Sequence, residues 1–146
     1  MKRILIILIG FLLVHNVNAK DYTFNGYGIS KQDAIEVSDN FKFSSYTSEG
    51  MWDDSNGDYG NEKCLGYVKQ INKKVELEVI CENINQDDKI FWNSRTRKSD
   101  KGAGIGQMKI LNGTGKYKKL IGMVCPYGVN YKKHYGWLKA KCKIEN

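Results

Sequence analysis

The strongest structural signal in this chain is KCLGYVKQINKKVELEVICE, residues 63–82. Polar and apolar residues alternate on both sides of Asn72-Lys73, which suits a two-residue hairpin loop. That register pairs residues across two strands: Cys64 with Cys81, Val68 with Leu77, Lys69 with Glu76, and Tyr67 with Glu78. One face then carries the cysteines and the apolar side chains, and a slip by one residue would expose that face. The stretch predicts a β-hairpin with a cross-strand disulfide.

A second cysteine pair, Cys125 and Cys142, has the same spacing. Strands near 120–127 and 136–144 would place the two residues opposite each other, with a longer polar and aromatic loop over 128–135. Four cysteines permit three connectivities, and we prefer 64–81 with 125–142 because each bridge then joins neighbouring strands. Zinc ligation is the weaker alternative, because closely spaced cysteine pairs are lacking. We expect two disulfides and no metal or cofactor.

The N-terminus has the pattern of an export signal. Lys2 and Arg3 precede an apolar run over 4–14, and Val17 and Ala19 occupy the small-residue positions of a cleavage site. The run is too short to cross a bilayer as a helix. We therefore expect a signal peptide over 1–19 and a single domain over 20–146, without a transmembrane anchor. The protein would be secreted or periplasmic, where disulfides persist.

The rest of the chain is typical of an all-β protein. Further strands are expected over 22–29, 41–52, 89–95 and 105–111, and residues 33–37 suit either a short helical turn or another strand. About eight strands with regular turn signals suit a closed antiparallel barrel or a sandwich.

A glycine-rich motif favours the barrel. Gly113-Thr114-Gly115-Lys116-Tyr117, followed by Gly122, is similar to the G-T-G-[RK]-[FY]-x4-G signature of allene-oxide-cyclase-like barrels, which include the dirigent proteins. The resemblance covers about 11 residues, plus a compatible strand count. It implies that Gly113 and Gly115 supply unusual backbone angles and that Tyr117 packs into the barrel end. We therefore expect a single antiparallel barrel of about eight strands. Pocket residues of those families have no match here, so the resemblance carries no activity.

Acidic residues are concentrated over 53–88, and lysines cluster later, over 116–143. A basic C-terminal half suits either a solubilising surface or an anionic partner. Arginine is scarce after the signal, with Arg95 and Arg97 alone, which disfavours specific nucleic-acid recognition. Asp54, Asn56 and Asp58 have the spacing of a calcium loop, and Asn83, Asn85 and Asp87 repeat it. Neither stretch has the required glycine, and turns favour the same residues.

Catalysis finds little support, because nucleophilic chemistry would depend on a single histidine after the signal. Aromatic residues interleaved with lysines can instead form a binding rim on sugars, bases or phenols. The candidate rim consists of Trp52, Tyr59, Tyr127, Tyr131, Lys132, Lys133, His134, Tyr135 and Trp137. We expect an exported, non-enzymatic barrel that binds a small amphipathic ligand or an envelope or extracellular partner. Such a partner would be an anionic surface or another protein. Two alternatives stay open: a secreted inhibitor acting through its loops, and a cyclase- or isomerase-like enzyme.

Overall fold

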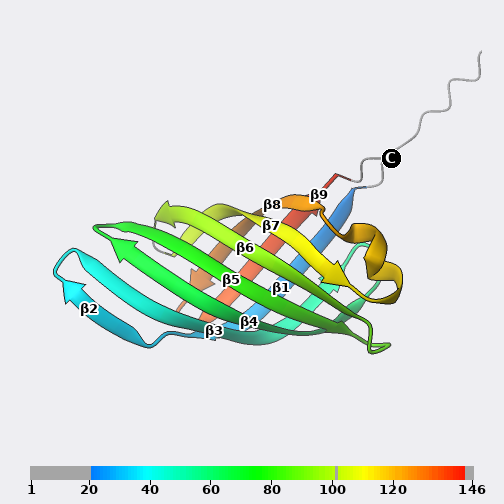
Figure 1. Ribbon diagram of the computed structural model, residues 1–146, viewed down its shortest axis with the longest axis horizontal. Helices are drawn as coiled ribbons and strands as arrows, with labels where there is room; N and C mark the ends of the chain where they lie inside the picture. The colour runs from blue at the N-terminus through cyan, green and yellow to red at the C-terminus, as the bar shows by residue number, and fades with distance from the viewer. Residues whose placement is uncertain (1–20, 101, 144–146) are drawn as a thin grey trace, which may run out of the picture.

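The computed structural model describes residues 21–100 and 102–143, so the predicted signal peptide and its cleavage near Ala19 lie outside the described residues. Within those ranges the chain forms nine strands and one short 3-10 helix (Figure 1). They are β1 (Tyr22–Lys31), β2 (Ala34–Ser38), β3 (Phe41–Asp54), β4 (Tyr59–Ile71), β5 (Lys74–Asn85), β6 (Ile90–Asp100), β7 (Ala103–Gly113), η1 (Gly115–Leu120), β8 (Val124–Lys132) and β9 (Tyr135–Cys142).

Eight of these strands close into an antiparallel barrel, which confirms the predicted fold class. Each strand pairs with its sequence neighbour from β3 to β9, and β1 joins the two edges by pairing with both β9 and β3. The short strand β2 continues the line of β1 along the first residues of β3. Because side chains alternate along a strand, one set from each barrel strand points into the interior.

The first hairpin has the predicted register. Cys64 lies opposite Cys81 and the loop is Asn72-Lys73, with Asn72 at a φ of 56°. Both disulfides form with the preferred connectivity, with Cα–Cα distances of 4.0 Å for Cys64–Cys81 and 4.4 Å for Cys125–Cys142. All four cysteines are buried, so the bridges lie inside the barrel wall.

The second hairpin differs from the prediction. Instead of a long loop over 128–135, β8 continues to Lys132, which pairs with Tyr135 across a two-residue turn. Lys133 adopts a φ of 59° in this turn. The polar and aromatic composition of the stretch suggested a loop. However, the more buried Val129 and Tyr131 alternate along the chain with exposed neighbours, as residues of a strand do.

The bounds of several other elements also differ from the predicted ones. Residues 34–38 form a strand rather than a helical turn, and β6 extends beyond Arg95 to Asp100. Residues expected to start a strand at Leu120 instead complete η1, and β8 begins at Val124. The glycine-rich motif therefore forms a helical turn between two strands.

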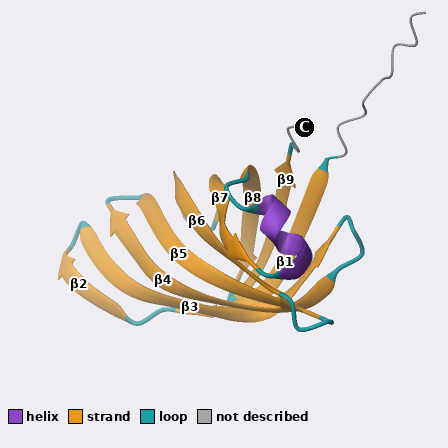
Figure 2. Ribbon diagram, turned by 45° about the vertical axis from the view of Figure 1, so that its right-hand side comes forward, coloured by secondary structure: helices purple, strands orange, loops and turns teal. Residues whose placement is uncertain are grey.

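This motif closes one end of the barrel, where η1 lies beside the start of β1 (Figure 2). Tyr117 is 2 % exposed and packs against Phe91 with ring centroids 4.9 Å apart, as the resemblance implied. Gly115 has a φ of 53°, which favours glycine. Gly113 has no such angle; a Cβ there would lie 2.8 Å from the Cβ of Tyr117, so close packing explains it.

The interior has two apolar clusters. The larger fills the closed end, defined by η1 and the turns at 55–58 and 86–89, and centres on Phe24, Trp52 and Phe91. The smaller surrounds Cys64–Cys81 and reaches toward the open end, which is defined by the turns at 72–73 and 133–134. In the part of the chain that the structure describes, no helix has the length and apolar character needed to cross a bilayer.

Candidate functional site at the open end of the barrel

Strand β6 carries both buried arginines of the barrel. Its inward positions run from Phe91 through Asn93 and Arg95 to Arg97, so the two guanidinium groups lie on the interior face. The two arginines have different surroundings, and the difference defines the site.

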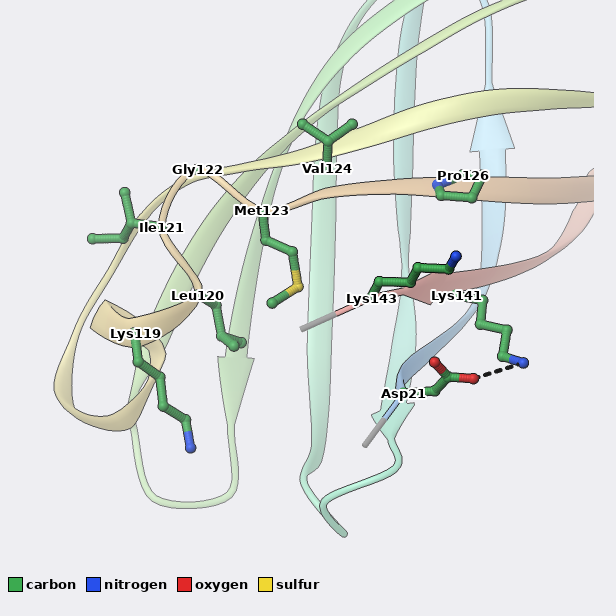
Figure 3. Close-up of a pocket in the computed structure, with 10 residues that line it drawn as sticks. All are labelled: Asp21, Lys119, Leu120, Ile121, Gly122, Met123, Val124, Pro126, Lys141 and Lys143. Carbon is green, nitrogen blue, oxygen red and sulfur yellow. Dashed lines mark ion pairs between the residues drawn. The ribbon is translucent and has the colours of Figure 1, made fainter. Parts of the chain in front are cut away.

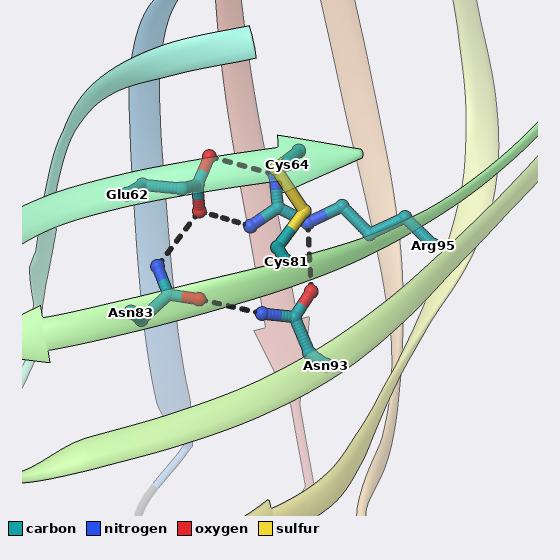
Figure 4. The surroundings of a disulfide bond; sticks show 6 residues. All are labelled: Glu62, Cys64, Cys81, Asn83, Asn93 and Arg95. Carbon is teal, nitrogen blue, oxygen red and sulfur yellow. Dashed lines mark hydrogen bonds and ion pairs between the residues drawn. A yellow bond between two sulfur atoms is a disulfide. The ribbon is translucent and has the colours of Figure 1, made fainter. Parts of the chain in front are cut away.

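Arg95 is fully paired. It forms an ion pair with Glu62, both side chains being less than a tenth exposed, and its Nη1 donates to Glu62 Oε1 at 3.0 Å. Its Nε donates to Asn93 Oδ1 at 2.9 Å. Figure 4 shows the network beside the Cys64–Cys81 disulfide, with Asn83 donating to Glu62 and accepting from Asn93. Every charge in this network has an opposite partner, as burial requires.

Arg97 is not paired in this way. The residue is 6 % exposed, and its Nε and Nη1 atoms are buried without a hydrogen-bond partner among the described residues. Its guanidinium carbon lies 5.4 Å from the centroid of the Tyr131 ring, a cation–π contact. Its cross-strand neighbours are Leu77 and Gly106, neither of which offers a side-chain acceptor. Burying a cation whose two donors have no acceptor lowers the stability of the fold, unless a ligand supplies the acceptors.

The Arg97 side chain lines a pocket of about 300 Å³ at the open end of the barrel. This open-end pocket is lined by Ser30, Gln32, Tyr46, Val68, Gln70, Val75, Leu77, Arg97, Gly102, Tyr131 and Lys133. Its two charged residues are both cations, and the described residues that line it include no carboxylate. Aliphatic side chains and aromatic rings form its walls, so it combines positive charge with apolar surface.

The tyrosines around Arg97 remain neutral donors. Burial raises the pKa of the Tyr131 hydroxyl, and the adjoining Tyr46 raises it further. Burial also raises the pKa of Tyr127, against the opposing effect of Arg95 and Arg97. Tyr127 donates to the carbonyl of Thr96 at 3.3 Å. Neutral hydroxyls do not compensate the charge of Arg97, so the pocket stays cationic at physiological pH.

The candidate rim residues separate into three groups. Trp52 and Tyr127 are buried inside the barrel, at 1 % and 3 % exposure, and belong to its core rather than to a rim. Tyr131 and Lys133 line the open-end pocket, with Lys132 and His134 exposed beside them. Tyr59, Tyr135 and Trp137 lie on the outer wall of the barrel.

The two acidic stretches with calcium-like spacing form matching turns. Asp54 Oδ1 accepts the backbone N–H groups of Asn56 and Asp58, at 2.8 and 3.0 Å. Asn85 Oδ1 accepts those of Asp87 and Lys89, at 3.0 and 2.8 Å. These side chains therefore hold turns at the closed end.

The side chains that could bind a metal ion do not form a usable metal site either. The one cluster of potential ligands among the described residues is Glu62, Cys64 and Cys81. Its two sulfurs are joined in a disulfide and its carboxylate holds Arg95, so no thiolate is present to bind a cation.

A larger hollow lies on the outside of the closed end (Figure 3). It has a volume of about 700 Å³ and lies between the η1–β8 connection, the first residues of β8, the end of β9 and Asp21. Its lysines, Lys119, Lys141 and Lys143, are exposed, and Lys141 forms an ion pair with Asp21 at 2.8 Å. Because its charged groups are solvated, it lacks the buried, unpaired group that distinguishes the open-end pocket.

Comparison with known proteins adds no further assignment: no protein-family model, curated protein or solved structure matches the chain. The site therefore rests on its own geometry.

Sequence reasoning missed the residues at the centre of this site. Arg97 was noted only as one of two arginines after the signal, and Tyr46 and Gln70 were not singled out. A usable signal was present, since Arg95 and Arg97 share the alternation of Phe91 and therefore point inward. The sequence could not show that Glu62 would pair with the first arginine, nor that the second would have no acceptor for its Nε and Nη1 groups within the described part of the chain.

Proposed function

We propose that this protein binds a small amphipathic organic anion in the open-end pocket. The buried Arg97 guanidinium, with two donors that have no partner among the described residues, carries this proposal. Guanidinium groups bind carboxylate, sulfonate and phosphate oxygens through two parallel hydrogen bonds. The ligand's anionic group would accept from Nε and Nη1 while its apolar portion contacts Val68, Val75 and Leu77.

The size and lining of the pocket support a ligand over a macromolecular partner. A volume of about 300 Å³ lies at the lower end of the range for small-molecule sites, roughly 300–1,000 Å³. Lys133 at the mouth adds a second positive charge. An inhibitor acting through its loops would need no such interior pocket.

The same lining favours binding over catalysis. General acid–base chemistry needs a titratable group in reach of the substrate, most often histidine or a carboxylate. The described lining residues include neither, and their titratable side chains are two tyrosines, Arg97 and Lys133. Two buried disulfides fit an oxidising compartment, which supports our proposal that the protein works outside the cytoplasm, in the periplasm or the medium. Membership of the allene-oxide-cyclase-like group stays a prediction from the glycine-rich motif.

Calorimetric titration with matched probes tests the proposal. Octanoate and phenylacetate should bind, whereas octanol and octylammonium should bind at least tenfold more weakly. Arg97→Met should weaken octanoate binding by about 10- to 100-fold, the value of one charge-assisted hydrogen-bonded contact.

Lys98→Met is the matched control, because it removes an exposed cation from the same strand. It should leave the affinity for octanoate unchanged. Equal anion binding by the Arg97→Met variant, or anions that bind no better than octanol, would exclude this function.

A further inference from the structure

A second candidate site lies on the outer wall of the barrel, away from Arg97. Six large side chains point outward from adjoining strands and are 44–60 % exposed. This aromatic platform consists of Tyr27 and Ile29 on β1, Met51 on β3, Tyr59 on β4, and Tyr135 and Trp137 on β9. It lines a shallow hollow of about 610 Å³.

The strand register orders these side chains into rows. Tyr27 lies directly opposite Trp137 on one side and Met51 on the other, and Met51 lies opposite Asn61 on β4. With strands about 4.8 Å apart, this row extends ~14 Å across the wall. Ile29 and Tyr135 form a parallel row beside it. This row holds two rings, Tyr27 and Trp137, and the other two rings belong to the rows on either side of it: Tyr135 beside Ile29, and Tyr59 opposite Asp53.

Polar groups border the platform at fixed positions. Asn25 Nδ2 donates to Asp53 Oδ1 at 2.6 Å, which orients a carboxylate and an amide beside Tyr27 and Tyr59. Glu49 lies opposite Ile29 at the other border, and Lys139 lies opposite Asn25. The border thus carries both signs of charge, and complements a neutral ligand with many hydroxyl groups.

We propose that the aromatic platform binds a neutral polysaccharide chain. Sugar rings have apolar faces that pack on tyrosine and tryptophan, and hydroxyl edges that hydrogen-bond to carboxylates and amides. The four rings, spread over three neighbouring rows, offer several stacking contacts to the sugar units of a chain, and the Asn25–Asp53 pair meets the hydroxyls at the platform's edge. A bilayer surface fits less well, because Glu49 and Asp53 would face anionic head groups.

Titration with soluble hexasaccharides tests this proposal. Cellohexaose, chitohexaose and maltohexaose are added to the wild-type protein while calorimetry and tryptophan fluorescence are recorded. At least one should bind with a saturable change in fluorescence, because Trp137 is 47 % exposed. Trp137→Ala should weaken that binding at least tenfold, and Tyr27→Ala should weaken it to a similar degree.

Tyr67→Ala is the matched control, since Tyr67 stacks on Phe43 elsewhere on the outer wall. It should bind the hexasaccharide with wild-type affinity. Three results would overturn the proposal: no binding of any hexasaccharide, equal binding by Trp137→Ala, or a wild-type dimer in sedimentation that Trp137→Ala dissociates. The last would make the platform an interface between two copies. Octanoate binding depends on the open-end pocket, which shares no residue with the platform, and should be unaffected in every platform variant.

Discussion

At the scale of single residues, two arginines on one strand have opposite relations to stability. Arg95 neutralises Glu62 inside the barrel and makes three hydrogen bonds with Glu62 and Asn93. Arg97 is as deeply buried but has two donors without partners among the described residues. A side chain that costs stability in the free protein and faces a pocket is typical of a binding residue.

Substituting the two arginines should therefore have opposite effects. Arg95→Met leaves Glu62 buried without a cation, and should lower the free energy of unfolding by about 3–5 kcal/mol. Arg97→Met removes a buried charge that has no ion pair with any described residue, and should raise the free energy of unfolding by about 1 kcal/mol or leave it unchanged. Urea denaturation without added anion measures both. Strong destabilisation by Arg97→Met would mean that the guanidinium stabilises the folded protein and is not held there for a ligand.

Two buried aspartates at the closed end should give opposite pH responses. Burial by itself raises the pKa of Asp58, but hydrogen bonds from Lys116, Gln86 and Tyr117 together lower it by more, so that the pKa lies below its usual value. Its contribution to stability is then present above the unfolded pKa of about 3.9 and lost as the pH falls through the folded pKa. Burial raises the pKa of Asp54, so its charged form opposes folding as the pH rises.

We expect Asp58→Asn to lose about 1–2 kcal/mol of stability at pH 7, with the difference from wild type shrinking as the pH falls below the unfolded pKa of about 3.9. Asp54→Asn keeps the side-chain oxygen that holds the turn, and should be neutral or stabilising at pH 7. Urea titrations between pH 2.5 and 7 compare the variants. A constant difference across this range for Asp58→Asn would show that its charge has no role.

At the scale of elements, the predicted hairpin and the observed one agree because several signals coincide over residues 63–82. Cysteines, apolar residues and the Lys69–Glu76 pair all require one register. Over 128–135 the signals conflicted, since lysines and tyrosines are common in loops and strands alike, and the tight turn at Lys133-His134 was missed. The partners of Arg95 and Arg97 depend on contacts between distant strands, which local patterns do not encode.

The η1 segment should behave as the plug of the closed end. Tyr117→Ala removes a ring packed against Phe91 and Trp52 and a hydrogen bond to Asp58, and should cost about 3–5 kcal/mol. Tyr117→Phe keeps the ring and should cost about 1–2 kcal/mol. Thermal unfolding provides the comparison, with the exposed Lys118→Ala as control. A Tyr117→Ala variant as stable as this control would contradict the role of a plug.

At the scale of the whole molecule, the barrel is filled at one end and hollow at the other. Aromatic packing under η1 seals the closed end, the Glu62–Arg95 network occupies the interior beside Cys64–Cys81, and the pocket with Arg97 occupies the open end. Two disulfides within the wall brace the hairpins on which this arrangement depends. The molecule thus resembles a cup whose binding group lies inside the mouth.

The central claim is that Arg97 receives an anion, and the most direct test observes its own side chain. The Nε–Hε resonance of Arg97 can be assigned by its loss in Arg97→Met and followed by ¹⁵N-edited NMR during ligand addition. We predict a saturable shift of this resonance with octanoate or phenylacetate, and none with octanol. A resonance that stays fixed with both anions, or that moves equally with octanol, would contradict the account.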